Sequence, residues 1–131
     1  MKLRLRQNTV RIRLTQSEVE RVGGGEEVRE TVSFAGRPLS YVLAPSDDAH
    51  AVHAAFDGSE VRVVAPRALV TAWANSNEVG FTSDASEQIA VLVEKDFACL
   101  TGRDERHADD DADTYPHPAA AAGSGSHGRC S

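Results

Sequence analysis

The fold is decided by a pattern of residues that occurs twice along the chain. The first copy reads LRQNTVRIRLTQSEV at residues 5–19, and the second reads FDGSEVRVVAPRALV at residues 56–70. In each copy, apolar and polar residues alternate on both sides of a polar turn, which is typical of a β-hairpin. Each hairpin is followed by a residue that favours the start of a helix. The pattern therefore predicts strand, turn, strand and helix in both halves.

The boundaries of these elements follow from the residues at the turns and caps. In the first half, TQSE at 15–18 matches a capping box, and the glycines at 23–25 end a short helix. In the second half, Asp57-Gly58 favours a tight hairpin turn, and Pro66 fits the first position of a helix. Further strand pairs are predicted at 28–34 with 39–43 and at 79–82 with 89–94. Ile89 to Val93 is apolar on both faces, which indicates a central strand.

Each half therefore has the predicted order β-β-α-β-β. A constant offset of 51 residues relates the halves without a gap, so that Val10 corresponds to Val61, Val22 to Trp73 and Tyr41 to Leu92. We expect an α+β fold of two pseudo-symmetric units, at about 2–45 and 50–95, that form one small antiparallel sheet or a barrel-like domain. The alternative is two unrelated α+β halves that share a spacing.

The composition changes near residue 101. Residues 101–131 are acidic and then rich in proline, alanine, glycine and serine, so we expect a flexible tail after a domain at 1–100. The net charge of −6 argues against general nucleic-acid binding by the whole chain. There is no apolar run of membrane-spanning length and no signal-peptide pattern, so we expect a cytoplasmic protein.

Four features of the chain carry a resemblance: MKLRLRQNTVRIRLTQSEVERV at the start, EKDFACL at 94–100, DDADTYPHP at 110–118 and a near-terminal cysteine, Cys130. Together they resemble a family of small uncharacterised bacterial proteins. The resemblance implies one domain with a tail in a bacterial cytoplasm and implies no activity. The units, and GSEVRVVAPRALVTAWANSNEVGF in particular, also resemble the swapped-hairpin units of AbrB-like transcription factors, in which basic residues of the hairpins contact DNA. The matching basic positions are largely lost in the second unit.

Five cations on the outer face of the first hairpin are candidates for contact with a polyanion or a partner. They are Lys2, Arg4, Arg6, Arg11 and Arg13. Side chains in such a row can line up against phosphates. The alternative is that they are solvated, or that they pair with Glu26, Glu27 and Glu30 on a neighbouring strand or with the acidic residues at 109–111.

Cysteine and histidine residues near the end of the chain are weak candidates for a metal site. They are Cys99, His107, His117, His127 and Cys130. Zinc favours four nitrogen or sulfur ligands, but these spacings match no compact zinc motif. The alternatives are inert thiols or a redox-linked pair of Cys99 and Cys130. No cofactor is expected, because the glycines at 123, 125 and 128 spell G-x-G-x-x-G without the strand and helix that a dinucleotide site needs.

No set of residues indicates a catalytic site, so a binding function ranks ahead of an enzymatic one. The first hypothesis is a non-enzymatic binding or regulatory module that uses the basic face of the first hairpin. The second is a metal- or redox-responsive protein that uses Cys99 and Cys130. The identity of any partner is open: it can be a protein, a second copy of the chain or, with less support, a nucleic acid, and a membrane is not expected.

Overall fold

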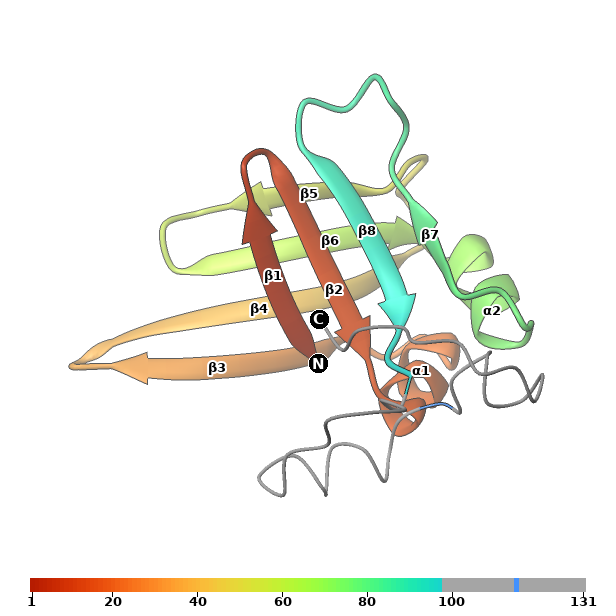
Figure 1. Cartoon of the computed structure of the whole chain (residues 1–131), viewed down its shortest axis with the longest axis horizontal. Helices are drawn as coiled ribbons and strands as arrows, with labels where there is room; N and C mark the ends of the chain where they lie inside the picture. The colour runs from red at the N-terminus through yellow and green to blue at the C-terminus, as the bar shows by residue number, and fades with distance from the viewer. Residues whose placement is uncertain (98–114, 116–131) are drawn as a thin grey trace, which may run out of the picture.

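The elements follow one another in two rounds of the same order (Figure 1). The computed structural model describes residues 1–97 and residue 115. The first unit contains β1 (Lys2–Arg6), β2 (Thr9–Leu14), α1 (Gln16–Gly23), β3 (Val28–Phe34) and β4 (Arg37–Ser46). The second contains β5 (His53–Phe56), β6 (Glu60–Pro66), α2 (Arg67–Ala74), β7 (Gly80–Thr82) and β8 (Ala90–Lys95). The predicted α+β class and the two β-β-α-β-β units are confirmed.

Each of the two four-stranded sheets takes one hairpin from each unit. One sheet has the order β1-β2-β8-β7 and the other has the order β3-β4-β6-β5. At the centre of each sheet the two units meet through a parallel pair, β2 with β8 and β4 with β6. The expected single antiparallel sheet does not form, because strands of different units lie side by side and run in the same direction. The prediction that β8 is a central strand is confirmed.

The two helices begin and end as their sequences indicate, with one difference. The capping box is present, since the Thr15 amide donates to Glu18 Oε1 at 2.9 Å and the Glu18 amide donates to Thr15 Oγ1 at 3.4 Å. Gly24 caps the other end of α1. Pro66 was predicted at the first position of the helix but is the N-cap of α2, one position before it. Its backbone is extended, with φ −55° and ψ 132°.

The inner faces of both sheets and the inner sides of both helices share one core. Val22 and Trp73, which the offset of 51 residues makes equivalent, are both fully buried. The Trp73 indole donates to the carbonyl of Val79 at 3.2 Å and meets the Phe81 ring edge-on at 5.2 Å. The helices approach closely, because a Cβ added to Gly23 would lie 2.6 Å from Cβ of Ala74.

The gapless correspondence of the halves is wrong beyond the helices. Val79 is 43% exposed, although the offset equates it with Val28, which is buried. Phe81 takes the place of Val28 instead, since Val28 lies opposite Leu43 and Phe81 lies opposite Val93. The segment after α2 is longer than the segment after α1, so the third strand enters its sheet later.

The correspondence between β4 and β8 differs from the offset of 51 residues in the other direction, by one residue. Tyr41 pairs with Val61, and Val91 pairs with Val10, which is the equivalent of Val61. Tyr41 therefore corresponds to Val91, at an offset of 50 residues, rather than to Leu92. The two central strands thus keep their alternating inward side chains despite the changed loop.

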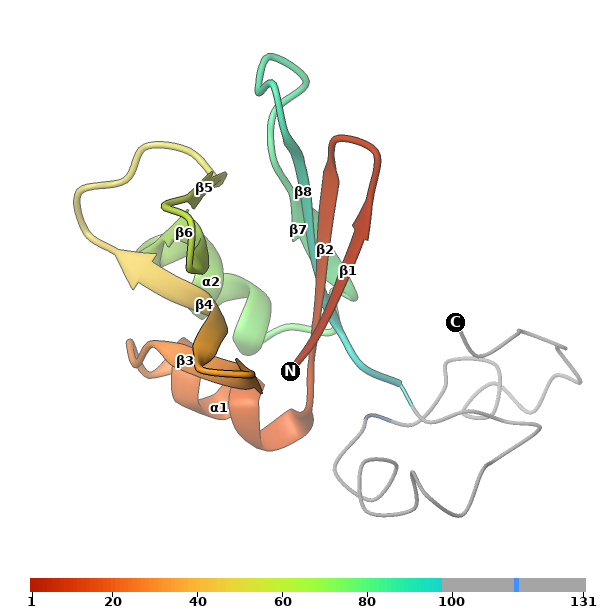
Figure 2. The ribbon, with the colours of Figure 1, turned by 90° about the vertical axis from the view of Figure 1, so that its left-hand side faces the viewer.

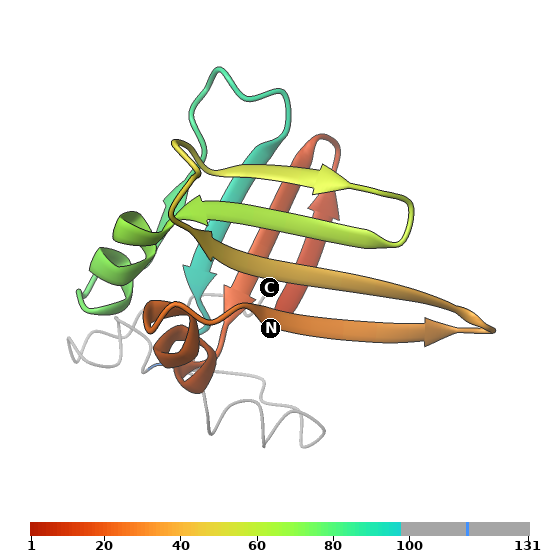
Figure 3. The same cartoon turned by 180° about the vertical axis from the view of Figure 1, so that it is seen from behind.

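The two sheets face each other, and the helices lie at one end of them (Figure 2). The helices follow directly on the ends of β2 and β6, so the β1–β2 turn lies at the opposite end. The β3–β4 hairpin projects beyond the other strands of its sheet (Figure 3). The end of the sheets away from the helices is therefore covered by neither helix.

Candidate functional site

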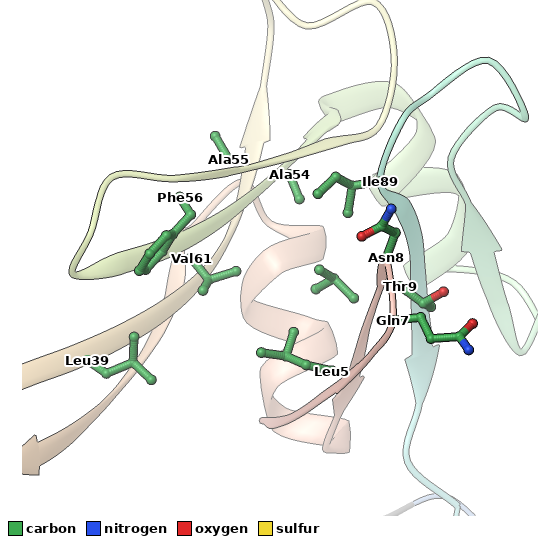
Figure 4. Close-up of a pocket in the computed structure, with 11 residues that line it drawn as sticks. Leu5, Gln7, Asn8, Thr9, Leu39, Ala54, Ala55, Phe56, Val61 and Ile89 are labelled. Carbon is green, nitrogen blue, oxygen red and sulfur yellow. The ribbon is translucent and has the colours of Figure 1, made fainter.

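A pocket lies between the two sheets at the end away from the helices (Figure 4). Its volume is about 390 Å³. One wall comes from the β1–β2 hairpin and the start of β8, and the other comes from β4, β5 and β6. The lining residues are Leu5, Gln7, Asn8, Thr9, Val10, Leu39, Ala54, Ala55, Phe56, Val61 and Ile89. None of them is charged, and most are apolar.

Most of the apolar residues that line the pocket lie at equivalent positions of the two units. Leu5 corresponds to Phe56 and Val10 to Val61, both at the offset of 51 residues. In each hairpin the two residues lie opposite each other, Leu5 with Val10 and Phe56 with Val61. Leu39 and Ile89 correspond at the offset of 50 residues that relates β4 to β8. The pocket therefore takes residues at matching positions from both units.

Large apolar side chains at this pocket are exposed to solvent. Leu5 is 59% exposed, Phe56 is 63% exposed and Ile89 is 38% exposed. Leu5 and Phe56 lie directly opposite the core residues Val10 and Val61 in their hairpins, which places them on the inner faces of the sheets. Contiguous exposed apolar surface of this kind marks sites where soluble proteins bind ligands or partners.

Polar side chains border the pocket at the β1–β2 turn. Gln7 has a positive φ of 51°, a backbone conformation that a side chain disfavours. The equivalent residue of the second unit is Gly58, with φ 103°. The side-chain carboxamide of Gln7 points to the far side of the hairpin, whereas that of Asn8 lies beside Ile89 at the pocket (Figure 4).

The second unit closes its equivalent turn with its own side chains. Asp57 Oδ1 accepts hydrogen bonds from the Ser59 amide at 2.8 Å, the Glu60 amide at 2.7 Å and the Ser59 hydroxyl at 3.2 Å. These bonds stabilise the charged form of the Asp57 carboxyl and lower its pKa. None of these three residues lines the pocket. The polar border of the pocket therefore comes from one unit only.

The predicted basic face is largely neutralised by acidic residues at the end of β8. The Lys2 ammonium forms an ion pair with the buried Asp96 at 2.9 Å. Glu94 accepts a short hydrogen bond from Arg11 and lies 3.7 Å from Arg13. The bond to Glu94 raises the pKa of Arg11, although partial burial opposes this. Three of the five cations are thus paired within the domain.

The remaining two cations, Arg4 and Arg6, are exposed and form no ion pair with the residues that the structure describes. The three glutamates that the sequence suggested as partners bind elsewhere, and the acidic residues at 109–111 lie outside the described part of the chain. Glu26 pairs with Arg21, Glu27 pairs with Arg29 and Arg62, and Glu30 lies 3.4 Å from the α-amino group of Met1. Internal pairing is present, but with Glu94 and Asp96 rather than with these glutamates, because the sequence did not show that β8 lies beside β2.

A second polar cluster surrounds Lys95 on β8. The Lys95 ammonium donates to the carbonyl of Ser76 at 2.6 Å and lies 5.7 Å from the ring centre of Trp73 and 5.3 Å from that of Tyr115. Burial lowers the pKa of Lys95, and the charge of Glu78 opposes this shift in part. The cluster is a lysine stabilised between aromatic rings.

Tyr115 shows that the predicted tail returns to the domain at this residue. Its amide donates to the carbonyl of Asp96 at 2.8 Å, it forms a parallel bridge with Phe97, and the two rings meet at 5.7 Å. Tyr115, which lies within the stretch predicted to be a flexible tail, therefore contacts the domain. The other residues of 101–131 lie outside the described part of the chain.

The proposed metal or redox residues also lie outside the described residues. These are Cys99, His107, His117, His127 and Cys130. Within residues 1–97 and 115, no group of three histidine, cysteine, aspartate or glutamate side chains is arranged to hold a metal ion. In the same part of the chain, neither helix has the length and apolar character needed to cross a membrane.

Comparison with known proteins identifies the family and no activity. No curated protein and no solved structure matches the chain. The family model described as "Family of unknown function (DUF7009)" matches residues 1–119. The match spans both units and includes Tyr115, the residue that packs against Lys95 and Phe97. The chain therefore belongs to the family of unknown function DUF7009.

Proposed function

We propose that this protein is a binding module, without catalytic chemistry, that holds an apolar small molecule in the pocket between its two sheets. One observation carries the proposal: equivalent residues of both units leave an uncharged, apolar pocket of about 390 Å³ open at one end. This volume falls within the range of ligand sites in proteins, which are predominantly apolar and bordered by a few polar groups.

The exposure of the pocket residues gives the physical reason for binding. Leu5 and Phe56 keep more than half of their surface in water in the free protein. An apolar ligand between them would remove that surface, and its own, from water. Apolar burial contributes roughly 25 cal/mol per Å², so even a compact hydrocarbon gains several kcal/mol from full enclosure.

The test measures binding of pyrene, a fluorescent hydrocarbon without hydrogen-bonding groups. The Phe56→Ser variant removes an exposed ring from the pocket wall. Its matched control is Phe34→Ser, which removes a ring of similar exposure, 56%, from the same sheet but outside the pocket. We expect pyrene to bind the wild type and Phe34→Ser alike, and Phe56→Ser at least about fivefold more weakly, the effect of about 1 kcal/mol.

Two results would reject the proposal. One is the absence of saturable pyrene binding to the wild-type protein. The other is an equal loss of binding in both phenylalanine variants, which would assign the binding to general apolar surface rather than to the pocket.

A second candidate function uses Arg4 and Arg6, the exposed cations that have no described acidic partner. They could contact a polyanion, as the sequence suggested for all five cations. The slope of log affinity against log salt for duplex DNA would then be about 2 at most, because each neutralised phosphate contributes about 0.9. A steeper slope, or unchanged binding in Arg4→Gln/Arg6→Gln, would reject this contact.

The redox or metal hypothesis stays a proposal for the end of the chain. Metal bound by Cys99, Cys130 and the histidines would co-purify at one ion per chain and be lost in Cys99→Ser. Elemental analysis of the purified protein, with and without that substitution, tests this. A metal-free wild type with two freely titrating thiols would exclude both a metal site and a disulfide.

A further inference from the structure

We propose that Asn8 is the polar anchor of the pocket and that it selects an uncharged ligand with one hydrogen-bonding end. This inference rests on the proposed function, since it specifies the ligand of the same pocket. Asn8 lies at the β1–β2 turn, and its side-chain amide lies beside Ile89 at the opening (Figure 4). Its backbone carbonyl is occupied, because it accepts a hydrogen bond from the Ala90 amide at 2.8 Å.

The two turns use the polar side chain at this position differently. Ser59, the equivalent of Asn8, donates its hydroxyl to Asp57 and lies outside the pocket lining. The side-chain carboxamide of Asn8 makes no hydrogen bond with any residue in the described part of the chain. The turn of the first unit thus leaves free the polar group that the turn of the second unit uses for its own closure.

The chemistry of the lining defines the polar end of the ligand. A carboxamide both donates and accepts hydrogen bonds, so it complements a hydroxyl or an amide. The pocket lining has no charged side chain that could neutralise an anion or a cation. An ionised group brought to this apolar surface would lose hydration without gaining an opposite charge. A neutral amphiphile, with its polar end at Asn8 and its apolar body between Leu5 and Phe56, fits these constraints.

The experiment compares decanol with decanoate at neutral pH, by displacement of bound pyrene. The two probes share an apolar chain and differ in the charge of the head group. We expect decanol to bind the wild-type protein at least about tenfold more tightly than decanoate, about 1.4 kcal/mol. In Asn8→Ser, which replaces the carboxamide by the shorter hydroxyl of the equivalent turn, we expect decanol to bind about fivefold to tenfold more weakly, because the shorter side chain does not reach the head group and one hydrogen bond is lost.

Pyrene itself serves as the internal control. It has no hydrogen-bonding group, so its affinity should be the same in the wild type and in Asn8→Ser. Leu39→Ala, which shortens the apolar wall, should weaken pyrene and decanol together.

Each outcome separates the two proposals. If pyrene binds in the pocket but decanol and decanoate bind equally well, or Asn8→Ser leaves decanol unaffected, then the inference on Asn8 is wrong and the proposed function stands. If pyrene does not bind, both are wrong. If Asn8→Ser weakens pyrene as much as decanol, Asn8 shapes the turn rather than contacting the ligand.

Discussion

At the scale of the residue, the two units differ most informatively at the turn of their first hairpins. Gly58 adopts a positive φ without steric cost, because glycine has no Cβ. Gln7 also adopts a positive φ, and its Cβ makes that conformation unfavourable. Strained backbone of this kind persists where the surrounding structure requires it, and it is common at binding sites. Gln7 immediately precedes Asn8, so its backbone sets the direction in which the Asn8 amide points.

We expect Gln7→Gly to stabilise the fold by about 0.5–1 kcal/mol, because glycine tolerates the left-handed conformation. The reciprocal substitution, Gly58→Gln, should destabilise by about 1 kcal/mol or more. Urea unfolding of both variants measures the two free energies. Asn8→Gly is the control, since the φ of Asn8 is not positive and no gain is expected there. A stability gain in Asn8→Gly equal to that in Gln7→Gly would show that the turn is generally flexible rather than strained at one residue.

At the scale of the element, the strands and helices were largely predictable from the sequence and their partners were not. Alternation gave the strand faces, and the capping box gave the start of α1, because both are local properties. The pairing of β2 with β8 is set by contacts far apart in the chain, and no local pattern encodes it. This is why the sequence found the five cations but missed Glu94 and Asp96 as their partners.

The ion pairs at β8 predict different effects for cations of the same hairpin. Glu94→Gln removes the charge that faces Arg11 and Arg13, both of which are partly buried, and should cost about 1 kcal/mol of unfolding free energy. Arg4→Gln should change stability by less than about 0.5 kcal/mol, as is usual for an exposed residue without a partner. Thermal unfolding at low and high salt measures both, and the Glu94→Gln deficit should shrink in high salt. Equal costs for the two variants would contradict the assignment of the ion pairs.

At the scale of the whole molecule, the domain includes a residue from beyond the compositional boundary near 101. The stretch from residue 101 onward lacks a hydrophobic period and was predicted to be a tail, and within it Tyr115 packs against Phe97 and Lys95. A single aromatic anchor leaves no periodic signal. The pocket was also beyond sequence reasoning, since Leu5 and Phe56 belong to different hairpins and come to face each other only when the sheets assemble.

We expect Tyr115→Ala to destabilise the domain by about 1–3 kcal/mol, because it removes a partly buried ring and a cation–π contact. A chain that ends at residue 105 should lose at least as much. A chain that ends at residue 119, where the family match stops, should keep full stability. Calorimetric unfolding of the three proteins tests this. Full stability in the chain ending at residue 105 would show that the contact of Tyr115 contributes nothing to folding.

The most direct test of the pocket is a titration with pyrene followed by methyl NMR spectroscopy of the full chain. An aromatic hydrocarbon bound between the sheets shifts the resonances of the methyl groups around it. We predict shifts at methyls of both units, in Leu5, Val10, Leu39, Val61 and Ile89. We predict none in Leu69 and Val79, which are exposed but lie outside the pocket. Shifts that cluster at those two residues, or that arise from one unit alone, would contradict a binding site shared by the two units.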